Sequence, residues 1–199
     1  TTPEEMLRLD TVLRKPLGIR RADGCGTQPW VYPEDSKNEE VTLTFKVESE
    51  IEAECLIAFE EMDSLKVNGE DIKIEEVGYF VDKDIRTAKM PRLKKGTNEI
   101  IVKAPIGKRV SLENYFLIGD FGVEVEGAAK TICENKEKIG FGSITNHKMP
   151  FYGGNISYFA EFDAEEDCKV EFITNYYRGE FVKVLLDGVD LGNIVIMPY

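Results

Sequence analysis

The order of predicted strands and turns in the first half of the chain recurs in the second half, and this repeat most limits the possible folds. Segment 41–47 alternates apolar and polar residues, an acidic turn follows, and two further strands end at Asn68-Gly69. The second half shows the same order from segment 156–162 to Asp187-Gly188. The offset is 115 residues at the first strand and 119 at the closing turn. Such self-similarity predicts two related modules.

We place these modules at residues 1–128, including an N-terminal arm, and 129–199. The first module continues beyond its hairpin to about Val125. Most of the corresponding part of the second module would fall beyond Tyr199. We therefore expect the second module to be incomplete at its C-terminus, and expect that about 45 further residues would complete it.

The predicted strands are short and bounded by turn residues, which is typical of an all-β sandwich. Asn68-Gly69 predicts a two-residue hairpin, because both turn positions need positive φ. The one predicted helix, at 2–7, has Thr2 as N-cap. Residues 9–33 contain many glycines and prolines without a period, so we expect an extended, loop-rich arm there. Other predicted strands are 55–59, 65–67, 99–103, 117–123 and 168–173.

The charge of the chain disfavours two classes of partner. Its 199 residues carry a net charge of −12, with a pI near 4.7. Such a chain lacks the electrostatic footprint for nucleic acid or an anionic membrane, so we expect neither as a partner. No stretch approaches the roughly 18 apolar residues of a membrane helix. A neutral or cationic partner fits better.

The four cysteines, Cys25, Cys55, Cys133 and Cys168, show no paired C-x-x-C spacing. Cys55 and Cys168 lie in or at the start of predicted strands. We expect reduced, mostly buried thiols, which behave as small hydrophobic side chains. This favours a cytoplasmic over a secreted location.

Signals for catalysis, metals and cofactors are weak. His147 is the only histidine, which excludes a multi-histidine zinc site, and no G-x-S-x-G nucleophile elbow is present. The 37 acidic residues make pairs such as Glu60/Glu61 and Asp82/Asp84 too common to indicate glycosidase chemistry by themselves. Asp82 and Asp84 share a strand face and are suited to a hard cation, but a solvated strand edge is the favoured interpretation. We predict no catalytic residue, no metal and no cofactor.

Among functional signals, aromatic side chains are the better candidates, since flat rings stack on the apolar C–H faces of sugars. The favoured interpretation of these aromatic residues is nevertheless structural: they seal the sandwich ends or the contact between modules. The candidates for contacting carbohydrate are Trp30, Tyr32, Tyr152, Tyr176, Tyr177 and Arg178.

Three segments carry a resemblance to a known family. Segment 117–123 reads Leu-Ile-Gly-Asp-Phe-Gly-Val, segment 149–158 contains Pro-Phe-Tyr-Gly-Gly, and segment 184–193 contains Asp-Gly-Val-Asp-Leu-Gly. Together they resemble the C-terminal β-sandwich region of large glycoside hydrolases, in the family 2 sugar-binding-domain-like group. Lys148-Met149 departs from the Gly-Tyr of that pattern.

The resemblance implies two tandem galactose-binding-like jelly rolls, the second incomplete. It also implies a non-catalytic accessory region of a carbohydrate-active enzyme, because the catalytic acids of such enzymes usually lie in a separate barrel domain. The expected partners are that catalytic domain and, weakly, carbohydrate. Two alternatives stay open: a protein-interaction or cell-surface adhesion module, and a small hydrolase that uses the acidic clusters.

Overall fold

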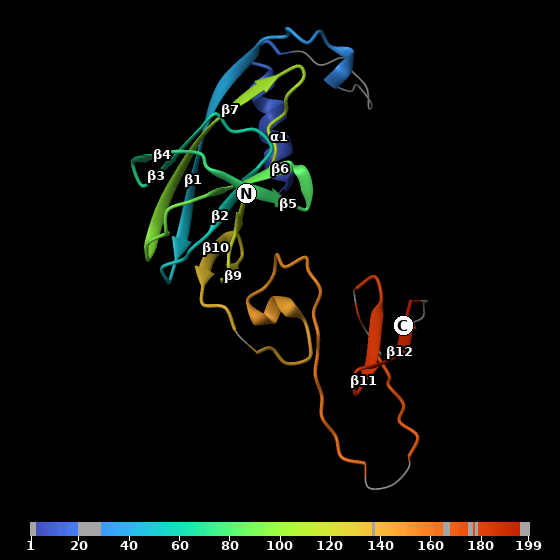
Figure 1. Ribbon diagram of the computed structural model, residues 1–199. Helices are drawn as coiled ribbons and strands as arrows, with labels where there is room; N and C mark the ends of the chain where they lie inside the picture. Colours follow the sequence, from blue (N-terminus) through green and yellow to red (C-terminus); the bar gives the residue numbers. More distant parts are fainter. Residues whose placement is uncertain are drawn as a thin grey trace. The chain divides into compact units, whose positions relative to one another are not determined.

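Figure 1 shows the computed structural model of the chain, which describes residues 3–19, 29–136, 138–164, 168–174, 177 and 179–195. Strands make up 40% and helices 8% of the described structure, so the prediction of an all-β fold is confirmed. The described part contains no helix long and apolar enough to cross a membrane. The elements in chain order are α1 (Pro3–Arg14), η1 (Pro29–Val31), β1 (Asn38–Ser49), β2 (Leu56–Phe59), β3 (Ser64–Val67), β4 (Glu70–Ile72), β5 (Glu76–Phe80), β6 (Asp82–Lys89), β7 (Gly96–Gly107), β8 (Phe116–Ile118), β9 (Gly122–Glu126), β10 (Ala129–Cys133), η2 (Ile144–His147), β11 (Val182–Leu186) and β12 (Val189–Ile194).

Helix α1 is longer than predicted, because the loop expected from residue 9 begins only after residue 14. Met6 is buried, and Leu9 and Leu13 pack against the same core at helical spacing. The helix-breaking residues that led to the loop prediction start at Pro16, beyond this amphipathic stretch. A helix of this length gains most of its stability by docking such a face.

The larger of the two main sheets has six strands in the order β4-β3-β7-β1-β10-β9. β1 and β7 are paired along their full lengths as antiparallel strands, whereas β1 and β10 are parallel. Ile100, Val102, Ala104 and Ile106 are buried at alternate positions of β7, so one face of this sheet lies on the core. The strands predicted at 41–47 and 99–103 lie within β1 and β7 and are confirmed.

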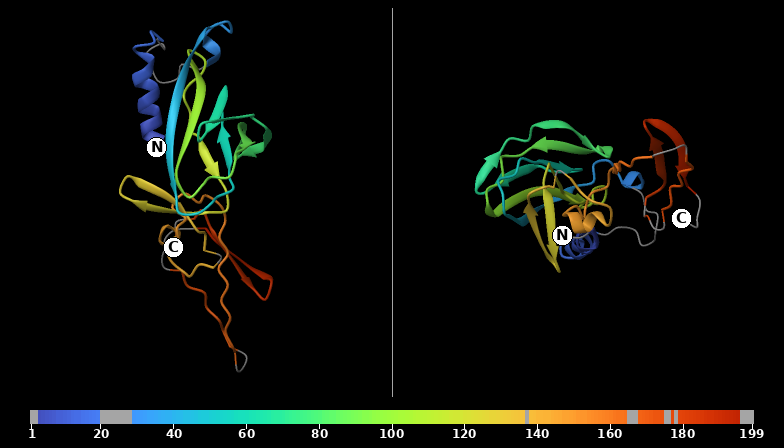
Figure 2. Two further views of the ribbon diagram at one scale, coloured as in Figure 1. Left: turned by 90° about the vertical axis from the view of Figure 1, so that its left-hand side faces the viewer. Right: turned by 90° about the horizontal axis from the view of Figure 1, so that it is seen from below.

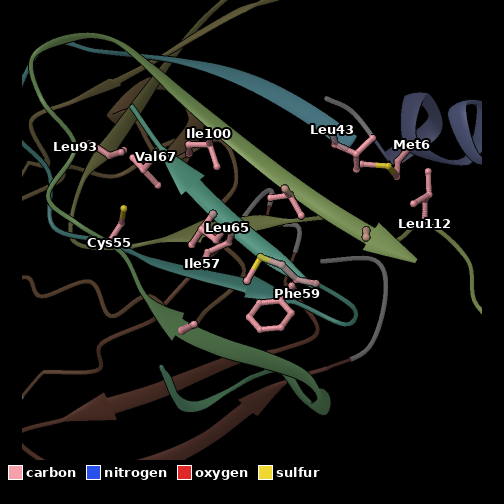
Figure 3. Packing of buried hydrophobic residues seen from close by; sticks show 14 of the residues in the cluster. Met6, Leu43, Cys55, Ile57, Phe59, Leu65, Val67, Leu93, Ile100 and Leu112 are labelled. Atoms are coloured by element: carbon pink, nitrogen blue, oxygen red, sulfur yellow. The ribbon is translucent and has the colours of Figure 1, made fainter. Parts of the chain in front are cut away.

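The second sheet has four antiparallel strands in the order β5-β6-β2-β8, and the hydrophobic core lies between the two sheets. Figure 3 shows Ile57 and Phe59 of the smaller sheet together with Leu65 and Ile100 of the larger one. Each such buried side chain contributes roughly 1.5–3 kcal/mol through removal of apolar surface from water. The first of the two units described below is therefore built on a sandwich-like core.

The Asn68-Gly69 hairpin forms as predicted, and the buried side chain of Asn98 holds it in place. Asn68 and Gly69 take φ of 50° and 87°. Asn98, which is fully buried, accepts hydrogen bonds from Asn68 Nδ2 at 3.0 Å and from the Lys94 N–H at 2.9 Å. Its own amide donates to the carbonyl oxygens of Lys94 and Gly96 at 2.7 and 3.2 Å. All its polar capacity is thus used inside the fold.

The chain divides into two compact units, residues 1–156 and 157–199. β10 lies within the predicted second module but pairs with β1 and β9 in the first unit. The predicted modules at 1–128 and 129–199 remain a prediction about repeated architecture.

In the second unit, β11 and β12 form a hairpin whose turn residues Asp187 and Gly188 have φ of 49° and 80°, as the sequence predicts. The strand predictions at 156–162 and 168–173 are wrong, since neither segment is a strand. A strand needs a neighbour for its backbone hydrogen bonds, and within the described part of this unit only β11 and β12 pair. Phe159 is accordingly 90% exposed.

Three cysteines lie in described residues and all are free thiols, as predicted; Cys25 lies outside the described residues. Cys55 and Cys133 are buried, whereas Cys168 is exposed, contrary to its predicted burial in a strand. Burial raises the pKa of the Cys55 thiol to about 11, so little thiolate exists there near neutral pH.

Candidate functional site

An exposed aromatic segment lies around η1 in the first unit. Trp30 is 72% exposed, and Tyr32 is half-buried beside it in the chain. Pro29 opens the turn with its fixed φ. The Pro33 carbonyl oxygen accepts two hydrogen bonds from Ser36, one from the backbone N–H at 3.1 Å and one from the side-chain hydroxyl at 2.7 Å. Local chain chemistry therefore shapes the segment that presents the indole ring.

Two cations after β7 hold Tyr32. Arg109 donates a hydrogen bond from Nη1 to the Tyr32 carbonyl oxygen at 2.8 Å. The Lys108 ammonium lies 6.0 Å from the centre of the Tyr32 ring, at the outer limit of a cation–π contact. We call Trp30, Tyr32, Lys108 and Arg109 the aromatic platform. Its members come from segments far apart in the sequence.

The turn that carries these cations is clamped to α1 by a buried ion pair. Arg14 Nε donates to Asp10 Oδ2 at 2.6 Å, one helical turn away. Arg14 also donates to the carbonyl oxygens of Gly107 at 2.5 Å and Val110 at 3.0 Å. Asp10 Oδ1 accepts the Leu112 N–H at 2.9 Å. Helix, turn and platform are therefore linked by charge-assisted hydrogen bonds.

The platform combines an exposed indole with hydrogen-bonding and cationic groups. An exposed flat ring in this setting is suited to stacking on a ligand with an apolar face. Such a surface excludes little water from a ligand, so any stacking here would bind weakly.

The other predicted contact residues do not join this platform. Tyr152 follows η2, its hydroxyl donates to the Asn155 carbonyl oxygen at 2.9 Å, and η1 and η2 lie at opposite ends of the first unit (Figures 1 and 2). Tyr177 belongs to the second unit, where its hydroxyl donates to the Ile194 carbonyl oxygen at 2.8 Å. Tyr176 and Arg178 lie outside the described residues.

A second feature, which sequence reasoning did not assemble, is an acidic hollow at one end of the four-stranded sheet. Its volume is about 470 Å³, and Glu60, Glu61, Lys83, Asp84 and Arg86 line it. The pKa of Glu60 is raised, first by burial and then by the neighbouring charges of Asp84, Glu61 and Asp82.

Arg86 supports this hollow from β6. Its guanidinium lies 5.1 Å from the centre of the Phe59 ring and pairs with Glu76 at 2.9 Å. It also reaches Glu61 at 3.9 Å and donates to the Glu60 carbonyl oxygen. Arg86 thereby holds the end of β2 against β5 and β6.

The sequence offered Glu60/Glu61 and Asp82/Asp84 as two separate pairs, and the sheet register brings them together. Phe59 pairs with Arg86 across β2 and β6, which places Glu60 beside the start of β6. Among the described residues, no group of three or more His, Cys, Asp or Glu side chains is arranged to hold a metal ion.

Comparison of the chain with protein-family models, with curated proteins and with solved structures gives no match.

Proposed function

We propose that this chain is a non-catalytic accessory region of a carbohydrate-active enzyme, and that it contacts carbohydrate weakly through the aromatic platform. The observation that carries the proposal is Trp30, a large ring that is 72% exposed on a segment anchored by Arg109. Exposed indoles on rigid supports are what sugar stacking requires. We also propose that the chain packs against the catalytic domain of its parent enzyme. Its fold is proposed to be that of tandem galactose-binding-like jelly rolls.

The expected affinity is low. A dissociation constant near 1 mM corresponds to only about −4 kcal/mol, which one or two stacked rings and a few hydrogen bonds supply. Tighter binding would need an enclosed pocket.

Trp30 is the only tryptophan, so its fluorescence reports on the platform alone. Titration with neutral monosaccharides and short oligosaccharides should shift this emission and give matching heats by calorimetry. Trp30→Ala should abolish the heat, whereas Tyr152→Ala, a change at the opposite end of the unit, should leave it unchanged. No emission shift with any sugar, or equal loss in both variants, would contradict carbohydrate contact at the platform.

The acidic hollow gives a reason to test the hydrolase alternative as well. A carboxyl group whose pKa is raised by burial and by neighbouring carboxylates is a pattern found in general acid catalysis. Turnover of aryl glycosides that is abolished by Glu60→Gln and by Asp84→Asn would establish that alternative and refute the non-catalytic proposal.

A further inference from the structure

The turn between β5 and β6 contains a residue that is unfavourable for both its backbone and its exposure. Val81 has a φ of 63° and is 84% exposed. A β-branched residue in the left-handed region is a genuine outlier, and glycine would remove both the strain and the exposed apolar surface. Strained, exposed positions of this kind cluster where a protein makes contacts.

Apolar surface continues from this turn across the end of the sheet. The rings of Phe80 and Phe116 lie 5.5 Å apart between their centres, and Phe116 is 37% exposed. Tyr115, the neighbour of Phe116, donates from its hydroxyl to the Glu61 carbonyl oxygen at 2.8 Å. The aromatic pair and the acidic hollow therefore occupy the same end of the four-stranded sheet, where β2 and β5 end and β6 and β8 begin.

The end of the sheet that carries Val81 has more carboxylates than cations, because Glu60, Glu61, Asp82 and Asp84 stand against Lys83 and Arg86. The carboxylates of Asp84, Glu61 and Asp82 lie close enough to Glu60 to interact electrostatically with its side chain. Arg86 is engaged by Glu76 and Glu61, which leaves Lys83 as the other cation of the hollow. Gathering like charges costs stability, and a cationic ligand relieves that cost.

We infer that this end of the sheet, the tip surface, binds a basic segment of a partner protein, with an apolar side chain on Val81 and Lys or Arg side chains among the carboxylates. The tip surface comprises Phe80, Val81, Phe116, Glu60, Glu61, Asp82 and Asp84.

Charge complementarity decides the occupant. A second copy of this chain, with net charge −12, would bring the same carboxylates against one another, which opposes association. Nucleic acid and anionic membrane are repelled for the same reason. A basic segment instead gains from both parts of the surface, because its cations meet carboxylates and its apolar side chains cover Val81 and the ring pair.

The probe is an acetylated and amidated octapeptide of alternating lysine and leucine, titrated into the full chain by NMR and calorimetry. Two matched peptides carry serine in place of leucine or glutamate in place of lysine. We expect the lysine–leucine peptide to bind about tenfold more tightly than either, with shift changes confined to residues near 59–61, 80–86 and 116. Equal binding of all three, or shifts that map elsewhere, would overturn the inference.

Val81→Gly separates this binding role from a structural one. The variant should have a higher Tm, because glycine accepts the positive φ without strain, and it should bind the peptide about tenfold more weakly. Val125→Ala, at an exposed position of β9 in the other sheet, should bind as the unmodified chain does. Unchanged binding by Val81→Gly would refute the contact.

Asp82→Asn combined with Asp84→Asn should weaken binding of the peptide and reduce the dependence of that binding on salt.

Discussion

Asn98 shows how one buried polar side chain fixes a turn and a strand end together. Asn98→Ala removes four hydrogen bonds and leaves the Lys94 N–H and carbonyl oxygen without that partner. We expect the free energy of unfolding to fall by about 3 kcal/mol, since each buried group left unsatisfied costs roughly 1–3 kcal/mol. Urea unfolding measures the loss, with Asn155→Ala, an exposed position of the same unit, as control. A loss equal to that of the control would show that the turn holds without this network.

Glu60 gives stability a defined dependence on pH. Its pKa is raised from 4.5 in the folded chain, first by burial, so the folded chain binds this proton more readily than the unfolded chain does. Its contribution to stability therefore falls as pH rises from 4.5 through the raised value. Glu60→Gln removes that titration and should stabilise the chain more near pH 7 than near pH 4. The comparison is urea unfolding at both pH values, with Glu39→Gln of β1 as control; an equal effect at both would refute the linkage.

Among the elements, α1 depends on its buried ion pair for docking. Arg14→Leu leaves the Asp10 carboxylate buried without its cation, and the Gly107 and Val110 carbonyl oxygens without a donor. We expect a loss of about 3–5 kcal/mol in the free energy of unfolding. Adding Asp10→Leu to the same chain should recover part of it, because the unpaired charge is then gone. A double variant that is less stable than Arg14→Leu alone would contradict this account.

Local chemistry made some elements predictable and left others hidden. Asn68-Gly69 and Asp187-Gly188 both form the expected hairpins, because the turn residues themselves require positive φ. The strands expected at 156–162 and 168–173 carry strand-like patterns without forming strands, since pairing depends on neighbours that a pattern does not name. The parallel pairing of β10 with β1 was hidden for the same reason.

The candidate sites also contain some residues that the sequence identifies and others that only the fold brings together. Trp30 and Tyr32 were recognisable from sequence as aromatic residues between prolines, because turn chemistry and ring type are local. Their partners Lys108 and Arg109 were not, since the loop after β7 reaches them only through the fold. The strain at Val81 likewise carries no sequence signal, because a valine between two strands is ordinary until its φ is known.

For the whole molecule, the two units differ in how far their apolar residues are covered. The first has a continuous buried core, whereas Phe159 and Ile173 in the second are mostly exposed and only β11 and β12 pair among its described residues. Local stability follows buried apolar contact, so amide exchange should divide the chain accordingly. By mass spectrometry, peptides of β7 should exchange slowest, those of β11 and β12 faster, and those of 157–164 and 168–174 near the unprotected rate.

The same exchange experiment tests the prediction that the second unit has little packed apolar core. Protection of 157–164 and 168–174 equal to that of β7 would mean that these residues pack into a stable core, and would contradict that prediction. Repeating the measurement at two protein concentrations separates this outcome from self-association, because protection that grows with concentration comes from contacts between copies. Protection absent at both concentrations, together with slow exchange in β7, is the result that the exposed apolar side chains of the second unit predict.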